Sequence, residues 1–129
     1  MTDVRKASWQ EFDLAVEKIA LQFRNQKFDY VTGIPRGGLC LAVALSHRLG
    51  IRLRTTVSYD SYGLVVDDIA DTGKTLSGIV GLNTDKCKVA TWFVRKGSLV
   101  VPDAFSTFLE TGEWVVFHWE KETDEPTCN

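Results

Sequence analysis

One stretch of this chain constrains its fold more than any other: residues 64–76, which read LVVDDIADTGKTL. The run from Leu64 to Asp67 is apolar and β-branched, which is typical of a buried strand. The residues from Thr72 to about Leu82 have helical spacing and begin with Thr-Gly-Lys-Thr. A strand that passes through a polar turn into a helix indicates an α/β unit, in which ligands bind beyond the carboxyl ends of the strands.

The rest of the chain continues this alternation of strands and helices. Further helices are predicted over 8–23, where Ser8 and Glu11 form a capping box, and over 39–49, which is apolar nearly all round and precedes Gly50. Further strands are predicted over 30–34, 52–58, 88–94, 104–109 and 114–117. This order predicts an α/β fold with a mostly parallel central sheet and helices on both faces, in a single domain over residues 1–129.

Composition excludes several classes of protein. A chain of 129 residues with 44% hydrophobic residues has room for one core. A formal net charge of −2 without a basic run argues against a nucleic-acid-binding module and a highly charged disordered chain. No segment resembles a signal peptide or a membrane span. Three widely spaced cysteines, Cys40, Cys87 and Cys128, favour a reducing cytoplasm, and residues 121–129 form a polar tail.

The polar residues of the 64–76 stretch indicate a site for a phosphorylated sugar. Two adjacent carboxylates, Asp67 and Asp68, are costly to bury, so they usually face a cation or ligand hydroxyl groups. The following Thr-Gly-Lys-Thr turn offers backbone amides and a helix start to an anion. A Walker A loop is excluded, because its spacing would need glycine at the position of Asp68.

The sequence VVDDIADTGKT resembles the phosphoribosyl-pyrophosphate (PRPP) signature of the type I phosphoribosyltransferases. The resemblance implies a type I phosphoribosyltransferase-like fold with a small hood. It implies that Asp67 and Asp68 hold the ribose 2′- and 3′-hydroxyls and take part in Mg²⁺ binding, partly through ligand and water. The implied 5′-phosphate loop is Ala70, Asp71, Thr72, Gly73, Lys74 and Thr75. Asp71 matches the aspartate that acts near purine N7 as general acid or base.

A glycine-rich turn after the first predicted sheet strand resembles the pyrophosphate loop of the same family. It consists of Pro35, Arg36, Gly37 and Gly38, with proline where the family often has serine. Glycine permits close approach of the backbone to pyrophosphate, and arginine neutralises its charge.

The resemblance over roughly residues 8–120 is strongest to the bacterial xanthine-guanine branch of the family. It implies that either Arg95 or Lys96 reads the purine 6-oxo group. It further implies that Trp114 stacks on the purine, that Val115 contributes backbone contacts and that Glu120 matches the acid of the base-binding stretch. Phe108 is a weaker stacking candidate. The implied division is a core over 8–103 and a hood over 104–120 together with N-terminal residues.

Catalytic members of the family carry a long mobile loop between the second and third strands, whereas Tyr59–Gly63 is the whole predicted connection here. The expected reaction is transfer of ribose 5-phosphate from PRPP to guanine, xanthine or hypoxanthine with release of pyrophosphate, a purine-salvage reaction. The short connection leaves two alternatives open: a regulator that binds PRPP or a nucleotide with little catalysis, and an enzyme for adenine, uracil or orotate. The family also implies a dimer or tetramer.

Overall fold

The computed structural model of the chain describes residues 3–58, 60–81, 85–110 and 112–120. Five parallel strands form the main sheet in the order β3 (Leu53–Arg54), β2 (Tyr30–Gly33), β4 (Gly63–Ala70), β5 (Cys87–Arg95) and β6 (Ala104–Leu109). A second sheet pairs β1 (Asp3–Lys6) with β7 (Glu113–Val116), also in parallel. The helices are α1 (Trp9–Gln22), α2 (Leu39–Leu49) and α3 (Lys74–Val80). The predicted polar tail over 121–129, with Cys128, and the predicted helix end at Leu82 lie outside the described residues.

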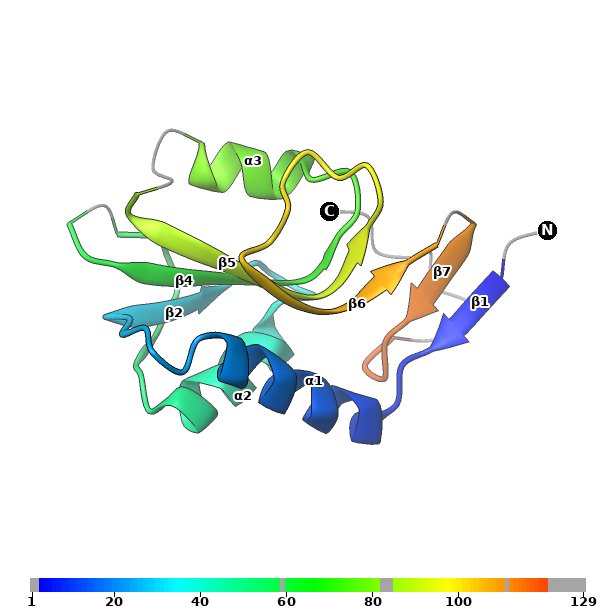
Figure 1. The fold of residues 1–129 in the computed structure, drawn as a ribbon, viewed down its shortest axis with the longest axis horizontal. Coiled ribbons are helices and arrows are strands. Elements are labelled where there is room, and N and C mark those ends of the chain that lie inside the picture. The colour runs from blue at the N-terminus through cyan, green and yellow to red at the C-terminus, as the bar shows by residue number, and fades with distance from the viewer. Residues whose placement is uncertain (1–2, 59, 82–84, 111, 121–129) are drawn as a thin grey trace.

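The main sheet is covered by helices on both faces. Figure 1 shows α3 on one face, and α1 with α2 on the other. The buried apolar residues accordingly form two clusters, a large one that includes Ile19 of α1 and Leu45 of α2, and a smaller one around Leu76 of α3. The predicted α/β fold with a parallel sheet and two helical layers is therefore confirmed.

Strand β4 is longer than predicted. The prediction ended it at Asp67, but its pairing with β5 continues through Ile69 opposite Phe93 and Ala70 opposite Val94. All eight residues of β4 are buried, because it is the central strand of the sheet. Both aspartates therefore lie within the buried strand, whereas the prediction placed them at its carboxyl end.

The second strand of the main sheet is much shorter than the predicted 52–58. Strand β3 has only two residues, which pair with Val31 and Thr32 of β2. Residues 55–62 therefore connect β3 to β4, and Tyr59 among them lies outside the described residues. Ser58 is held to the sheet by the buried Tyr30 hydroxyl, which accepts from the Ser58 amide at 2.9 Å and donates to the Ser58 carbonyl oxygen at 3.1 Å.

The helices begin and end close to the predicted residues, with one difference in burial. The capping box of α1 is present: the Glu11 amide donates to Ser8 Oγ at 3.1 Å, and the Ser8 amide donates to Glu11 Oε1. Helix α2 is not buried on all sides as predicted, because Leu39 and Val43 are about 40% exposed beside an apolar cavity of about 360 Å³. Among the described residues, no helix has the length and apolarity to cross a membrane.

The predicted hood boundary at residue 104 is wrong. Residues 104–109 form β6, which pairs along β5 from Ala90 to Arg95 and so belongs to the main sheet. The hood is the small sheet of β1 and β7, so it keeps the N-terminal residues that the prediction assigned to it, and in it Val4 lies opposite Trp114. Strand β1 was not predicted, because its sequence Asp-Val-Arg-Lys is mostly charged and lacks an apolar pattern.

Candidate active site

The predicted ribose-binding carboxylates, Asp67 and Asp68, lie near the carboxyl end of β4 and are completely buried. The Asp68 amide donates to Asp67 Oδ1 at 2.8 Å. Thr91 on β5 lies opposite Asp67 and is also fully buried, and among the described residues its hydroxyl makes no hydrogen bond. The centre of the sheet thus contains a polar cluster that an apolar core would not require.

Burial alters the acidity of this pair. Removal from water and, to a smaller extent, the neighbouring Asp68 charge together raise the pKa of Asp67 to about 9. Burial likewise raises the pKa of Asp68, to about 6, against the opposing effect of its hydrogen bond with Asp67. The charge of Glu120 contributes to the rise at Asp68. The two carboxyls therefore retain a proton near neutral pH, with Asp67 as its principal holder.

The predicted pyrophosphate loop closes over the acid pair. A Cβ atom placed on Gly37 would lie 2.0 Å from Asp68 Oδ2, so only glycine permits this approach. The next residue, Gly38, is equally confined, since a Cβ there would lie 2.5 Å from the Val66 carbonyl oxygen. The peptide bond between Pro35 and Arg36 is cis, and both side chains are exposed. The loop thus brings backbone groups against the buried Asp68 carboxylate and leaves the Arg36 side chain exposed beside it in the sequence.

The predicted 5′-phosphate loop leads from β4 into α3. Gly73 has φ of 82°, a left-handed conformation that favours glycine, and it begins the helix at Lys74. Thr72 stays outside the helix, because its carbonyl oxygen accepts from the Leu99 amide at 2.9 Å and its hydroxyl accepts from the Lys74 amide at 3.3 Å. The side chains of Thr72, Lys74 and Thr75 are exposed, whereas Ala70 and Gly73 are buried. Exposed hydroxyls and a lysine beside a helix start suit an anion.

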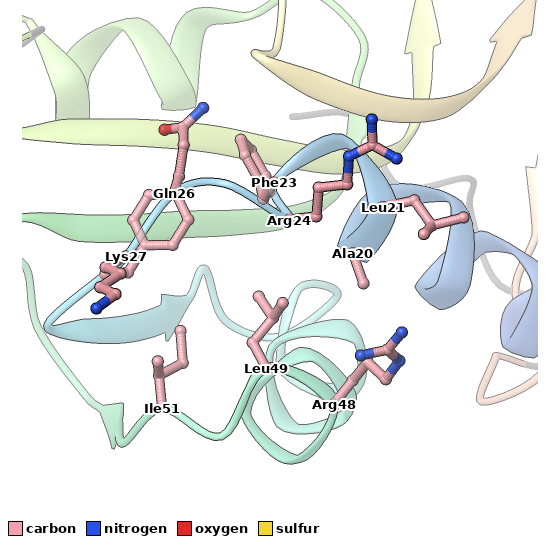
Figure 2. Close-up of a pocket in the computed structure, with 10 residues that line it drawn as sticks. Ala20, Leu21, Phe23, Arg24, Gln26, Lys27, Arg48, Leu49 and Ile51 are labelled. Carbon is pink, nitrogen blue, oxygen red and sulfur yellow. The ribbon is translucent and has the colours of Figure 1, made fainter.

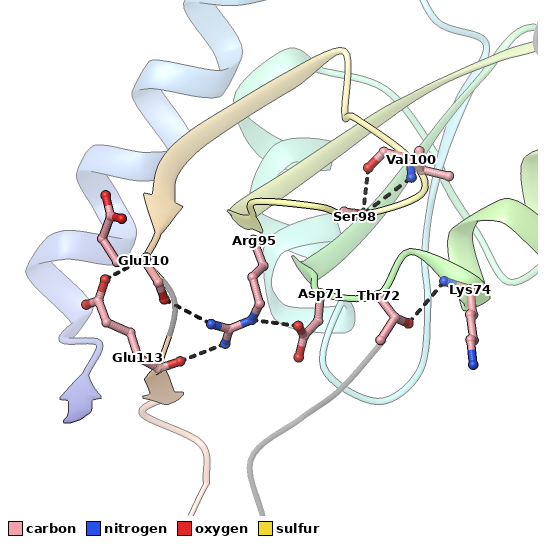
Figure 3. Close-up of polar contacts among 8 residues, drawn as sticks. All are labelled: Asp71, Thr72, Lys74, Arg95, Ser98, Val100, Glu110 and Glu113. Carbon is pink, nitrogen blue, oxygen red and sulfur yellow. Dashed lines mark hydrogen bonds and ion pairs between the residues drawn. The ribbon is translucent and has the colours of Figure 1, made fainter. Parts of the chain in front are cut away.

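Asp71 and Arg95, two of the predicted site residues, bind each other. Figure 3 shows Arg95 Nε directed at Asp71 Oδ1, at a distance of 2.6 Å. The side chains are only 17% and 8% exposed, so water screens this ion pair weakly. The other guanidinium nitrogens donate to the carbonyl oxygens of Glu110 at 3.1 Å and Glu113 at 2.7 Å. These two carbonyl groups could not be found from sequence, because residue type does not determine a backbone acceptor.

The other predicted base-binding residues lie in or near the hood. Trp114 is half-buried, and the Arg95 guanidinium carbon lies 5.4 Å from its ring centre. Val115 is buried, and Glu120 accepts from the Phe117 amide at 3.0 Å. Lys96 is exposed just beyond the end of β5. Phe108 is 59% exposed on β6, where it packs edge-on against Phe105.

Sequence reasoning missed two further contributors. Arg5 on β1 donates to Glu11 at 3.0 Å and lies 5.3 Å from the centre of the Phe93 ring, so it joins the hood to the core. The segment 98–100 packs against Gly73, whose added Cβ would lie 2.6 Å from the Leu99 nitrogen. Neither belongs to a recognisable motif, since both act through contacts between distant parts of the chain.

The donor set determines what kind of magnesium site is possible here. Among the described residues, no group of three or more His, Cys, Asp or Glu side chains is arranged to hold a metal ion. Two adjacent carboxyls with raised pKa values nevertheless supply hard oxygen atoms beside a negatively charged ligand site. Asp67 and Asp68 are therefore the residues that would face a magnesium ion held mainly by ligand oxygens and water.

A second cavity lies away from these residues. It has a volume of about 430 Å³ and lies between the carboxyl ends of α1 and α2, as Figure 2 shows. Its floor includes Phe23, Phe28 and Leu49, and Arg48 lies at its edge. It contains none of the predicted site residues, so we assign the candidate site to the β4 end of the sheet.

No family model matches the chain, but individual proteins do. The xanthine-guanine phosphoribosyltransferase of Idiomarina loihiensis is 26% identical over 137 residues, covering 88% of this chain and 84% of the relative. That of Cereibacter sphaeroides is 29% identical over 120 residues, covering 74% and 71%. Among solved structures, a purine phosphoribosyltransferase from Pyrococcus horikoshii superimposes with a TM-score of 0.82 at 29% identity, covering 97% of this chain and 99% of that one.

Proposed function

This chain has the type I phosphoribosyltransferase fold and is a sequence relative of bacterial xanthine-guanine phosphoribosyltransferases, and from this premise we propose that it is a purine phosphoribosyltransferase. It transfers ribose 5-phosphate from PRPP to guanine, xanthine or hypoxanthine and releases pyrophosphate, as in purine salvage. The observation that carries the proposal is the position of Asp71, which follows the buried acid pair and also contacts Arg95 beneath the hood.

The PRPP half of the proposed site uses residues of two loops. Lys74 and the hydroxyls of Thr72 and Thr75 receive the 5′-phosphate at the start of α3. Arg36 neutralises charge on the leaving pyrophosphate, and the backbone of Gly37 and Gly38 permits its close approach.

The acid pair recognises the ribose diol in this proposal. In the absence of ligand, burial keeps a proton on the pair. Two ribose hydroxyls supply hydrogen-bond donors that offset the charge of the ionised carboxylates, so ligand binding favours loss of that proton. Magnesium, bound through PRPP oxygens and water beside Asp67 and Asp68, would neutralise developing charge on pyrophosphate.

Asp71 is the general acid or base at purine N7 in this proposal. Its carboxylate lies between the phosphate loop and the hood, held by Arg95 at 2.6 Å. Trp114 offers one face of its ring to the purine. The guanidinium carbon of Arg95 lies 5.4 Å from the centre of the same ring. A positioned carboxylate supplies general acid–base catalysis, which typically accelerates a reaction by about 10²–10⁴-fold.

A regulator that binds PRPP or a nucleotide is the second candidate function. It is favoured by the eight residues, 55–62, that connect β3 to β4, where catalytic relatives are expected to carry a long covering loop. An exposed reacting centre lowers transfer and permits hydrolysis of PRPP by water. A second copy of the chain could cover the site instead. The dimer or tetramer, the magnesium dependence and the cytoplasmic location all stay predictions.

A panel of acceptors tests the proposal. The chain is incubated with PRPP and Mg²⁺, and separately with guanine, xanthine, hypoxanthine, adenine, uracil and orotate, while nucleotide and pyrophosphate are measured. We expect turnover with at least one 6-oxopurine and little with adenine or the pyrimidines. Turnover with adenine, uracil or orotate alone would show that the protein is a phosphoribosyltransferase for that base. Tight PRPP binding with no nucleotide in any arm would favour the regulator.

A further inference from the structure

The guanidinium group of Arg95, one of the predicted base-binding residues, is surrounded by contacts within the protein. Nε donates to Asp71, and the other two nitrogens donate to the carbonyl oxygens of Glu110 and Glu113. Figure 3 shows all three contacts spreading from one planar group. The guanidinium also lies over the Trp114 ring. Each nitrogen thus already donates one hydrogen bond within the protein before any base enters the site.

The hydrogen-bond partners of Arg95 come from separate elements of the fold. Asp71 follows β4, Arg95 ends β5, and Glu110 and Glu113 lie on either side of the turn from β6 into the hood strand β7. Arg95 therefore connects the 5′-phosphate loop to the hood. A lysine could not replace it, because a compact ammonium group lacks the planar fork with which the guanidinium reaches three separate acceptors while it lies over an aromatic ring.

We propose that Arg95 is a positioning residue: it holds the carboxylate of Asp71 and the ring of Trp114 in a fixed relation and does not itself read the base. This inference rests on the proposed function, because the two groups that it aligns are the general acid–base and the stacking surface of that reaction. Misplacement of a reacting group by about 1 Å costs about 10²-fold in rate, which makes such alignment valuable.

The proposal differs from the base-reading role in what it predicts for kinetics. A residue that contacts the purine 6-oxo group changes the KM for the base and the preference among bases. A residue that orients Asp71 lowers kcat for every base that is used and leaves the KM for PRPP unchanged. The two roles therefore separate in a comparison of kcat with KM.

Arg95→Lys tests the proposal, with Arg48→Lys as its matched control. Arg48 also binds a carboxylate through two nitrogens, at 2.7 Å and 3.1 Å from Glu17, but lies away from the site. We expect Arg95→Lys to lower kcat about 10–100-fold with the KM for PRPP within about twofold, and Arg48→Lys to change neither. A raised KM for the base with unchanged kcat would overturn the proposal and support base reading.

A double substitution shows whether Arg95 acts through Asp71. In an Asp71→Asn background, Arg95→Lys should lower kcat by less than about twofold further, because the group that it orients is already inactive. Independent, multiplying losses in the double variant would contradict the positioning role. If Arg95→Lys does not fold, Arg95→Gln, which keeps an amide donor near Asp71, replaces it in both experiments.

A readout without catalysis separates this proposal from the proposed function. Hydrogen exchange of the amides in β7 (Glu113–Val116) should be at least about tenfold faster in Arg95→Lys than in the unsubstituted protein, while β5 amides stay unchanged. Unchanged exchange in β7 would overturn the positioning role even in an active enzyme. Absence of nucleotide formation by the unsubstituted protein would instead reject the proposed function, and the exchange result would still decide the role of Arg95.

Discussion

The two halves of the candidate site are built in different ways. The proposed PRPP half consists of short contiguous segments at the ends of β2 and β4, and its two carboxylates are buried in the central strand of the sheet. The proposed base half is the hood, which joins the two ends of the described chain through the pairing of β1 with β7. The first depends on the sheet itself, whereas the second depends on side chains that attach it to the sheet.

The hood needs these attachments, since an isolated two-stranded sheet has little stability in water. Phe117 follows β7 and stacks on Trp119 at 5.0 Å, and it also contacts Phe93 at 5.8 Å. Arg5 and Arg95 add contacts from β1 and from the end of β5. The comparison implies that substitutions in the PRPP half change chemistry directly, whereas those in the hood change how the base is presented.

Asp71→Asn should have the largest effect. Asparagine keeps the shape and accepts a hydrogen bond from Arg95, but it does not carry the proton at N7, so kcat should fall about 10²–10⁴-fold. Steady-state kinetics with saturating PRPP measures this. Asp103→Asn is the matched control, because Asp103 accepts from the Val89 amide at 2.8 Å and has no place in the site. Unchanged turnover in folded Asp71→Asn would remove Asp71 from the chemistry.

Gly37→Ala should have the next largest effect, and it tests the close contact between the pyrophosphate loop and the acid pair. The added Cβ would overlap the Asp68 carboxylate, so the loop has to shift at a cost of about 1–3 kcal/mol. We expect kcat/KM for PRPP to fall about 10–100-fold. Gly78→Ala is the control, since a Cβ there would meet no heavy atom within 4 Å beyond its chain neighbours and the backbone of its own helix. Equal behaviour of the two variants would show that the loop does not rest on Asp68.

The stability of the ligand-free protein should depend on pH through the acid pair. A carboxyl with a raised pKa in the folded state stabilises the fold at low pH, and that contribution is lost as pH rises through the folded pKa. The values of about 6 for Asp68 and about 9 for Asp67 place the loss between about pH 4 and pH 9.

Asp67→Asn isolates this effect, because asparagine remains uncharged. We expect it to stabilise the ligand-free protein by about 1–2 kcal/mol at pH 8, with the difference disappearing toward pH 4. Urea unfolding at several pH values measures the free energy of unfolding, and Asp13→Asn, on an exposed position of α1, is the control. A variant less stable than the unsubstituted protein at pH 8 would show that the carboxylate is already compensated.

Trp114→Ala should have the smallest effect and should fall on the base alone. Loss of a stacking ring costs about 0.7–1.4 kcal/mol, so the KM for the purine should rise about 3–10-fold while the KM for PRPP stays unchanged. Phe108→Ala is measured beside it, because Phe108 is the other stacking candidate and is 59% exposed. A larger rise in Phe108→Ala would transfer the stacking role to β6.

The sequence predicted the secondary structure around Asp67 and Asp71 well and that of the hood poorly, for a physical reason. Residues 64–76 carry strand, turn and helix signals in one contiguous stretch, so local chemistry identifies the elements around Asp67 and Asp71. It could not show that β4 continues through Asp68, because continuation depends on pairing with β5. The hood depends on contacts between segments far apart in sequence, so β1 and the carbonyl partners of Arg95 carried no local signal.

A single-turnover experiment tests the central claim that the two halves form one phosphoribosyl-transfer site. Protein in excess over radiolabelled guanine, xanthine or hypoxanthine, each in a separate reaction, is mixed with PRPP and Mg²⁺, and labelled nucleotide and pyrophosphate are followed over time. The account predicts that the label passes from at least one of these bases to its nucleotide, with one pyrophosphate released for each nucleotide formed. Recovery of the label only as free base in all three reactions, while PRPP is bound or hydrolysed, would contradict it.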